Sequence, residues 1–376
     1  MALGKVGFVG WRGMVGSVLM ERLRSEGDFD GIATPVFFSS SQVGQRGPDT
    51  GCGTEQRGVL QDAYDLDALA DMDVILTCQG GAYTQAVHGP LRERGWKGYW
   101  VDAASTLRMA TSSVIVLDPV NRSVIDRALN DGVNDFIGGN CTVSLLLMAL
   151  GGLLERDLVE WVSPHTYQAA SGAGARMMQE LIQQMGVIET SVSSLLSDPA
   201  AAILDIDQRV SQCLRADTFP IEQAGAPLAG SLLPWIDAAV EAGRTREEWK
   251  AEAEANKILA RLNDPIHIDG ICVRVGAMRC HSQALTLKLK RPMPPTEVEA
   301  MLADHNEWVR VVPNDRASTL AQLTPAAVTG TLSVPIGRIH SLSMGPEYMA
   351  AFTVGDQLLW GAAEPLRRML GILGDA

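Results

Sequence analysis

The feature that most constrains the fold is a glycine-rich turn directly after the first apolar segment. Residues 6–9 are typical of a buried strand, and Gly10, Gly13 and Gly16 follow in a GxxGxxG pattern as a helical segment begins at Met14. Glycines here allow a tight turn and a close approach of the backbone to a pyrophosphate at a helix N-terminus. A turn that serves packing alone is the alternative. Its position at the start of a strand–helix–strand pattern favours a dinucleotide site.

Short apolar strands and helices alternate through the first 140 residues. Strands are expected at residues 6–9, 35–38, 74–77, 99–102, 114–117 and 134–137, and helices at 14–24, 84–94 and 121–130. This alternation predicts a parallel sheet with helices on both faces. The predicted fold class is therefore α/β, beginning with a Rossmann-like dinucleotide-binding domain.

The pattern changes after Gly138 and Gly139. We expect an apolar helix at 141–154, a strand at 161–169 and a long helix from about residue 175. Residues 271–275 and 285–289 alternate apolar and polar side chains, which suits a largely antiparallel sheet with one buried face. Residues 355–373 have a helical period and could pack back on the first domain. We therefore assign residues 1–139 and 357–376 to the dinucleotide-binding domain and 140–356 to a second, α+β domain with a mixed sheet.

Composition excludes several classes of function. The 376 residues carry a net charge of −13, which argues against a nucleic-acid binder. The longest strongly apolar stretch, residues 143–154, is too short to span a bilayer, and the N-terminus is not typical of a signal peptide, so a cytoplasmic location is expected. Six cysteines are spread without CxxC pairs, which favours reduced thiols and no metal site.

The end of the second strand bears on the choice of cofactor. NAD enzymes usually place a carboxylate there to bind the ribose 2′-hydroxyl. This chain has Ser39, Ser40 and Ser41 instead, and Arg12 lies in the first glycine loop. Hydroxyl donors and a guanidinium suit the 2′-phosphate of NADP, although a plain serine-rich turn beside a solvated arginine is the alternative.

Cys141 is the best candidate for a nucleophile. It follows Gly138, Gly139 and Asn140 at the predicted start of an apolar helix. A helix N-terminus favours a thiolate and should lower the pKa of this cysteine. The glycines admit a ligand, and Asn140 could donate to an oxyanion. The alternative is a structural cysteine behind an asparagine cap.

Other polar residues could complete a site with this thiol. Arg274 and His281 lie on consecutive predicted strand segments and could converge, although each could equally be an ordinary strand residue. Thr245 opens a helix with a capping box, which places Glu247 and Lys250 on one helical face. Taken alone, that charged pair is typical of a solvated surface.

Sequence motifs along the whole chain resemble those of one enzyme family. They are, in order, GFVGWRGMVGSVLM, GGNCTVSL, TYQAASG, REEWKAE, CVRVGAMRCHSQA and VGDQLLWGAAEPLRRML. These motifs are similar to those of aspartate-semialdehyde dehydrogenase of the type found in Gram-negative bacteria. One departure is Ala173, where that family has a further glycine.

The resemblance implies roles for individual residues. Cys141 would be the nucleophile, His281 the general acid/base, and Asn140 and Gln168 would assist them. The substrate-binding residues would be Arg108, Gln168, Glu247, Lys250 and Arg274, with Arg274 on the α-carboxylate, Glu247 on the α-ammonium, and Arg108 and Lys250 on the phosphoryl group. The NADP site would include Gly10, Arg12, Gly13, Met14, Val15, Ser40, Ser41, Gln79, Ser171, Gly172 and Gln357.

The reaction implied is the reversible, NADPH-dependent reduction of L-aspartyl-4-phosphate to L-aspartate 4-semialdehyde and phosphate. It would pass through a thioester on Cys141, and the imidazolium of His281 would protonate the oxygen of the intermediate. The resemblance also implies a homodimer. Two rivals stay open: another acyl-phosphate reductase, such as N-acetyl-glutamyl-phosphate reductase, and a non-catalytic NADP-binding protein.

Overall fold

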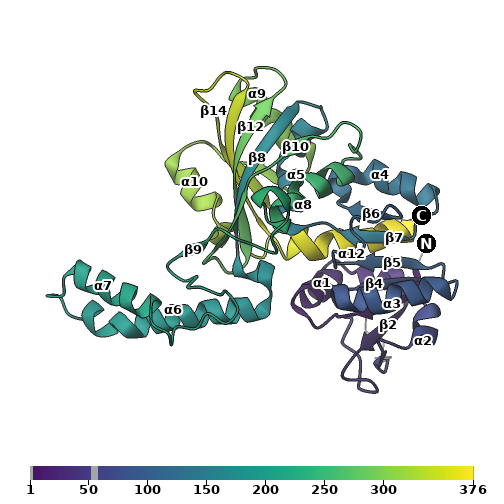
Figure 1. The fold of residues 1–376 in the computed structure, drawn as a ribbon. Helices are drawn as coiled ribbons and strands as arrows, with labels where there is room; N and C mark the ends of the chain where they lie inside the picture. Colours follow the sequence, from purple (N-terminus) through teal and green to yellow (C-terminus); the bar gives the residue numbers. More distant parts are fainter. Residues whose placement is uncertain (1–2, 52–57, 376) are drawn as a thin grey trace.

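The computed structural model describes residues 3–51 and 58–375, so Cys52 lies outside the described residues. Two sheets with their helices make up the molecule (Figure 1). The first sheet is parallel throughout, with the order β3-β2-β1-β4-β5-β7-β6. Its strands are β1 (Leu3–Val9), β2 (Ile32–Ser39), β3 (Gln61–Asp62), β4 (Val74–Thr77), β5 (Tyr99–Asp102), β6 (Ser113–Val116) and β7 (Asp135–Gly138).

Helices cover both faces of this sheet because its strands are apolar on both sides. On one face Phe8 and Phe136 join a core with the helices at either end of the chain, and on the other Ile75 and Trp100 pack with Tyr83 of α3. The helical segments are α1 (Met14–Ser25), η1 (Asp28–Gly31), α2 (Leu66–Ala70), α3 (Gly81–Glu93), α4 (Asp118–Asn130) and, from the C-terminus, α12 (Glu364–Asp375). The α/β fold class and the return of the tail to this sheet are confirmed.

The second sheet has the order β13-β14-β15-β12-β8-β11-β9, with β10 beside β8. Its central pairs β8–β12, β12–β15 and β14–β15 are antiparallel, whereas β8–β11 and β13–β14 are parallel. The strands are β8 (Val159–Gln168), β9 (Leu232–Leu233), β10 (His267–Ile268), β11 (Ile271–Val275), β12 (Cys280–Leu289), β13 (Val309–Val311), β14 (Val334–Ser341) and β15 (Tyr348–Asp356). The predicted mixed, largely antiparallel sheet is confirmed.

One apolar helix, α5 (Cys141–Leu154), runs from the junction of the two sheets into the second core. Every residue from Thr142 to Leu154 is buried. Against it pack α8 (Arg246–Ile258), α9 (Pro295–His305) and the π-helical segment η4 (Leu359–Ala363). The second domain also contains η3 (Glu241–Gly243), α10 (Arg316–Gln322) and α11 (Pro325–Val328). The helix packs by apolar contacts on all sides, and its first turn lies at the domain junction.

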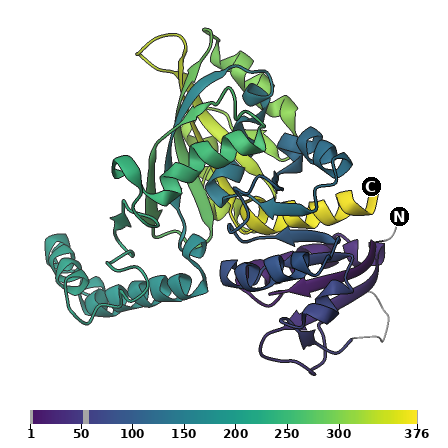
Figure 2. The same cartoon turned by 45° about the vertical axis from the view of Figure 1, so that its right-hand side comes forward.

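Two helices extend away from both sheets in Figures 1 and 2. They are α6 (Ala175–Leu196), which follows the short turn η2 (Ala170–Ala173), and α7 (Ile203–Leu214). No residue of α7 is buried. Among the described residues, no helix is long and apolar enough to cross a membrane.

Three expectations about the second domain are wrong. The strand β11 pairs parallel with β8, and β8 separates it from β12, so Arg274 and His281 do not lie on neighbouring strands. The apolar alternation of β11 also does not mark its buried side: Cys272 and Arg274 are buried, while Ile271 is 49% exposed. The tail remains a strand through Asp356 and becomes an α-helix only at Glu364.

Candidate active site

A cavity of about 430 Å³ lies where the two domains meet. Its walls come from the carboxyl edge of the first sheet, from the turn before α5, and from β8, β11 and α8 of the second domain. Ten of the predicted site residues line it, namely Val15, Arg108, Asn140, Cys141, Gln168, Gly172, Glu247, Lys250, Arg274 and Gln357. The fold therefore gathers residues from distant motifs into one space.

Cys141 and His281 are in direct contact. The Sγ atom of Cys141, at the first position of α5, lies 3.3 Å from Nε2 of His281, near the start of β12. His281 is fully buried, and its Nδ1 accepts a hydrogen bond from the backbone N–H of Ala169 at 3.0 Å. In the neutral ring this bond leaves the proton on Nε2, which faces the sulfur. The pair has the geometry of a nucleophile beside its acid/base partner.

The charge state of this pair differs from the expectation. Burial raises the pKa of Cys141 to about 12, and Glu247 adds to the increase, while Arg274 and Arg108 oppose it. Burial, together with Arg274, lowers the pKa of His281 to about 3. The predicted lowering of the pKa of Cys141 is therefore not found in the free protein, where the neutral thiol and the neutral imidazole are the resting forms. The helix N-terminus favours the thiolate, but removing the sulfur from water costs more than that favourable field returns.

Asn140 acts as the cap of α5. Its Oδ1 accepts from the backbone N–H groups of Thr142 and Val143 at 3.0 and 3.2 Å. Its Nδ2 donates to Glu247 at 3.0 Å, which leaves one amide proton for a ligand. Asn140 thus combines the capping role with a contact to Glu247 in the cavity wall.

Glu247 is buried, so interpreting its pair with Lys250 as a solvated surface pair is wrong. The carboxylate accepts from Gln168 at 3.3 Å and from Lys250 at 3.0 Å, and Lys250 also donates to Asp237 at 2.8 Å. Burial lowers the pKa of Lys250, but Glu247 and Asp237 outweigh it and the net shift is upward. The cavity wall therefore holds a cation and an anion side by side.

Arg274 converges with His281 although β8 lies between their strands. Its Nη1 donates to the backbone oxygen of Ala169 at 2.7 Å, and the N–H of the same residue binds His281. Both side chains lie against Gly172, where an added Cβ would come within 2.9 Å of Arg274 and 3.1 Å of His281. A glycine is needed at this position because two functional side chains occupy the space.

Arg108 has a partner that the sequence analysis missed. Its guanidinium donates to Glu254 at 3.0 Å and to the backbone oxygen of Gly138 at 2.8 Å. The other oxygen of Glu254 accepts from the backbone N–H of Asn140 at 2.7 Å. The spacing of Glu247, Lys250 and Glu254 is i, i+3 and i+7, which places all three on one helical face, and this signal could have identified Glu254.

Gly361 is a second residue that the sequence analysis missed. It lies in η4 and lines the cavity, and a Cβ at this position would come within 2.7 Å of the Cβ of Cys141. Segments of π-helix are frequent at functional sites because they change the direction of a helix locally. In the sequence, a glycine inside a helical segment did not indicate that it would contact Cys141.

The glycine turn after β1 has the geometry of a pyrophosphate site. Gly10 has a φ of +73°, and a Cβ there would come within 2.5 Å of the backbone of Gln79. Gly13 precedes α1 without any side-chain cap, so the N–H groups at this helix terminus face outward. A Cβ at Gly16 would come within 2.2 Å of the backbone oxygen of Gly10. The turn therefore fits a dinucleotide.

The remaining predicted cofactor residues follow neighbouring strands. The guanidinium of Arg12 contacts Gln42 and lies 3.4 Å from the hydroxyl of Ser41, while the amide of Gln79 lies 3.5 Å from the hydroxyl of Ser40. Ser39 is buried and caps this turn. Asp62 of β3 pairs with Ser39 of β2, so a carboxylate does lie on the strand adjacent to this turn. The carboxylate accepts a hydrogen bond from the backbone N–H of Tyr64.

Gln357 lines the cavity, and Ser171 is buried beside it. The amide of Gln357 donates to the hydroxyl of Ser171 at 2.8 Å.

Among the described residues, no group of three or more His, Cys, Asp or Glu side chains is arranged to hold a metal ion.

Two family models match the chain. Residues 5–128 match the NAD binding domain of semialdehyde dehydrogenase, and residues 150–360 match the dimerisation domain of semialdehyde dehydrogenase.

Among solved structures, aspartate semialdehyde dehydrogenase from Francisella tularensis is 50% identical, with a TM-score of 0.92 over 98% of this chain and 99% of that one. Two more distant structures share the fold. They are aspartate semialdehyde dehydrogenase II from Vibrio cholerae (21% identity, TM-score 0.76, 99% of each chain) and the NADP complex from Candida albicans (17%, 0.66, 99% of each chain).

Proposed function

The chain belongs to the semialdehyde dehydrogenase family, and from this premise we propose that it is an aspartate-semialdehyde dehydrogenase that uses NADP. The reaction is the reversible reduction of L-aspartyl-4-phosphate to L-aspartate 4-semialdehyde and phosphate. Its product serves the biosynthesis of lysine through diaminopimelate, and of threonine and methionine.

One observation carries this assignment: the charges around Cys141 complement every charged group of the substrate. Arg274 offers a planar fork to the α-carboxylate, and Glu247 offers a carboxylate to the α-ammonium. Arg108 and Lys250 are the cations for the phosphoryl group. A reductase for N-acetyl-glutamyl phosphate would have no use for Glu247, because the nitrogen of that substrate is acylated and uncharged.

We assign the chemistry to Cys141 and His281. The sulfur forms a bond to the acyl carbon as the bond from that carbon to the phosphate oxygen breaks. The thiol proton leaves with the phosphate as hydrogen phosphate, and a thioester remains. The dinucleotide, when bound, supplies the hydride that reduces this thioester. Nε2 of His281 carries a proton that it shares with the oxygen of the resulting intermediate. It recovers this proton as the carbonyl re-forms and the bond from carbon to sulfur breaks.

Asn140 and Gln168 orient these groups. The free amide proton of Asn140 is available to the oxygen of the intermediate. Gln168 is buried beside Glu247 and would orient the substrate and the thioester on Cys141.

The dinucleotide is assigned to the edge of the first sheet. The turn of Gly10, Arg12, Gly13, Met14 and Val15 would hold the pyrophosphate, and Ser171, Gly172 and Gln357 lie at the nicotinamide end, beside Cys141. Arg12, Ser40, Ser41 and Gln79 support NADP over NAD, because they offer donors to a 2′-phosphate.

We propose a homodimer in the cytoplasm. The second domain matches a dimerisation domain, and its sheet exposes apolar side chains at Ile271 (49% exposed) and Leu232 (53% exposed), which a second copy would cover. A reducing compartment keeps Cys141 a free thiol. Sedimentation at micromolar concentration tests the dimer, and a monomer would contradict it.

The function is tested by mixing protein, L-aspartate 4-semialdehyde, NADP and phosphate, and following the absorbance of NADPH. We expect turnover by the parent protein and none by Cys141→Ser, whose hydroxyl is a much weaker nucleophile. NADP binding by Cys141→Ser should stay within about a few-fold of the parent, because the substitution leaves the dinucleotide turn intact. Turnover of N-acetyl-glutamate semialdehyde instead, or of neither aldehyde, would contradict the assignment.

A further inference from the structure

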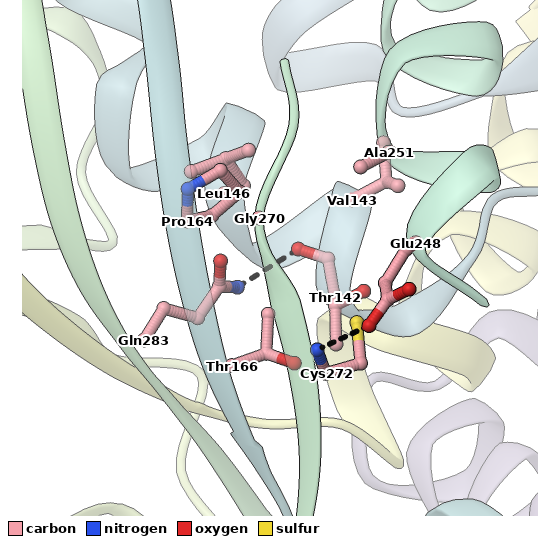
Figure 3. Close-up of a pocket in the computed structure, with 10 residues that line it drawn as sticks. All are labelled: Thr142, Val143, Leu146, Pro164, Thr166, Glu248, Ala251, Gly270, Cys272 and Gln283. Carbon is pink, nitrogen blue, oxygen red and sulfur yellow. Dashed lines mark hydrogen bonds between the residues drawn. The ribbon is translucent and has the colours of Figure 1, made fainter. Parts of the chain in front are cut away.

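A buried glutamine joins the two elements that carry Cys141 and His281. Gln283 lies two positions after His281 on β12, so both side chains project from the same face of the strand. The Nε2 of Gln283 donates to the backbone oxygen of Thr142 at 2.9 Å, and Thr142 is the residue that follows Cys141 in α5 (Figure 3). Among the described residues, the two polar contacts between α5 and β12 are this bond and the contact of Cys141 with His281.

The rest of the contact between this helix and the sheet is apolar. Side chains such as Val143, Leu146 and Leu150 pack without directional preference, so they fix the depth of the helix better than its rotation or its slide along the sheet. A hydrogen bond is directional and is confined to a few tenths of an ångström. The bond from Gln283 therefore acts next to Cys141, where a small slide would change its distance to His281.

The bond to Thr142 fixes the orientation of the Gln283 amide. Gln283 is 1% exposed, and its Oε1 has no hydrogen-bond partner among the described residues. Gln283 lines a small cavity of about 10 Å³, together with Thr166, Glu248 and Cys272 (Figure 3). Turning the amide around would bring two acceptors together at Thr142, so the orientation is settled. The amide donor is therefore the part of Gln283 that the contact with α5 uses, and a methionine of similar size would remove it.

We propose that Gln283 is a positioning residue, which holds the first turn of α5 against β12 and thereby sets the distance between Cys141 Sγ and His281 Nε2. It touches neither substrate nor cofactor in this assignment. The proposal rests on the function proposed above only in its kinetic consequences, because the contact between sulfur and imidazole exists without any ligand.

Three variants test this role. Gln283→Met removes the donor at similar volume, and Gln283→Glu can donate to Thr142 only while its carboxyl is protonated. Gln184→Met is the matched control. Gln184 is a buried glutamine of α6, remote from the cavity, whose amide donates to the backbone oxygen of Pro220 at 2.7 Å and accepts from the backbone N–H of Leu228 at 2.9 Å.

Three measurements are compared with the parent protein: the midpoint of thermal unfolding, the kinetic constants, and the rate at which iodoacetamide alkylates Cys141 as a function of pH. For Gln283→Met we expect an unfolding midpoint lowered by no more than that of Gln184→Met, which loses more hydrogen bonds. Its kcat should fall by about tenfold or more, because small displacements of reacting groups are costly. The KM for NADP should not change, and the pH midpoint of alkylation should move. Gln184→Met should unfold earlier but keep the parent's kcat and alkylation profile.

Gln283→Glu provides the rescue. Glu248 borders the same cavity, so the new carboxyl should retain its proton to a higher pH than an exposed glutamate. Relative to the parent at each pH, the alkylation of Gln283→Glu should be altered in alkaline solution and should approach the parent's as the pH falls.

Two outcomes would overturn the proposal. One is a Gln283→Met protein with the parent's kcat and alkylation profile. The other is one that unfolds earlier and loses activity only in proportion to its folded fraction. If the parent itself does not turn over aspartate semialdehyde, the proposed function fails, and the alkylation profiles still decide the role of Gln283.

Discussion

The Sγ atom of Cys141 lies 3.3 Å from Nε2 of His281, although 140 positions separate the two residues in the chain. Burial raises the pKa of the thiol to about 12 and lowers that of the imidazole to about 3, so the free protein holds both groups uncharged. Substrate binding has to change this state, since the thiolate is the nucleophile. The residues around the pair therefore control reactivity through charge as well as position.

Replacing Glu247 should make Cys141 more reactive in the free protein. After burial, the carboxylate of Glu247 is the largest cause of the raised pKa. Glu247→Gln removes that charge, so the pKa of Cys141 should fall and the thiolate fraction at a given pH should rise. Iodoacetamide alkylation should reach its half-maximal rate at a lower pH than in the parent. Glu252→Gln, on the same helix, is the control and should leave the profile in place; an unchanged or upward shift for Glu247→Gln would contradict the electrostatic argument.

Arg274 and Lys250 should fail in different ways because we assign them to opposite ends of the substrate. Arg274→Lys loses the planar fork that matches two carboxylate oxygens. Removing one buried charged contact costs about 2–5 kcal/mol, so every reaction of the semialdehyde should slow, by roughly thirtyfold to roughly five-thousandfold. Lys250→Ala should chiefly raise the KM for phosphate, and also that for arsenate.

Steady-state kinetics in the oxidising direction, with phosphate and semialdehyde varied separately, distinguish the two. If Lys250→Ala left the phosphate KM unchanged while Arg274→Lys raised it, the substrate would lie the other way round in the cavity.

Glu254→Gln should weaken phosphate binding although Glu254 itself does not line the cavity. Its two oxygens accept from Arg108 and from the backbone N–H of Asn140, and an amide would turn a donor toward one of them. Losing a hydrogen bond to a charged group costs about 1.5–3 kcal/mol, which corresponds to a rise in the phosphate KM of roughly ten- to a hundredfold. Dinucleotide affinity should stay at the parent's value. A variant with the parent's phosphate KM would show that Glu254 does not support Arg108.

Ser40→Asp should weaken NADP binding, because its carboxylate would repel the 2′-phosphate near Arg12. Dissociation constants of both dinucleotides for the parent and the variant test this. A parent protein that binds NAD more tightly than NADP would refute the assignment of Ser40 and Ser41.

Local patterns in the sequence determined much of this protein. The glycine turn, the alternation of apolar strands with helices and the apolar run after Cys141 predicted the parallel sheet and placed α5 at residues 141–154, its observed bounds. These features follow from short-range rules of turn geometry and side-chain periodicity, so residues near each other in the chain suffice to identify them. The motifs shared with the family predicted the site residues, because these motifs occur along the chain in the same order as in the family.

Only the tertiary structure decided which residues are in contact and how deeply each group is buried. The strand β8 inserts between β11 and β12, so Arg274 meets His281 through Ala169 and across Gly172 rather than from an adjacent strand. Glu247 changes from an apparent surface charge to a buried one, and desolvation, which depends on the whole fold, reverses the expected pKa shift of Cys141. Glu254 and Gln283 reach the first turn of α5 from 114 and 141 residues away. Such contacts depend on how distant elements pack, and no periodicity along the chain encodes that packing.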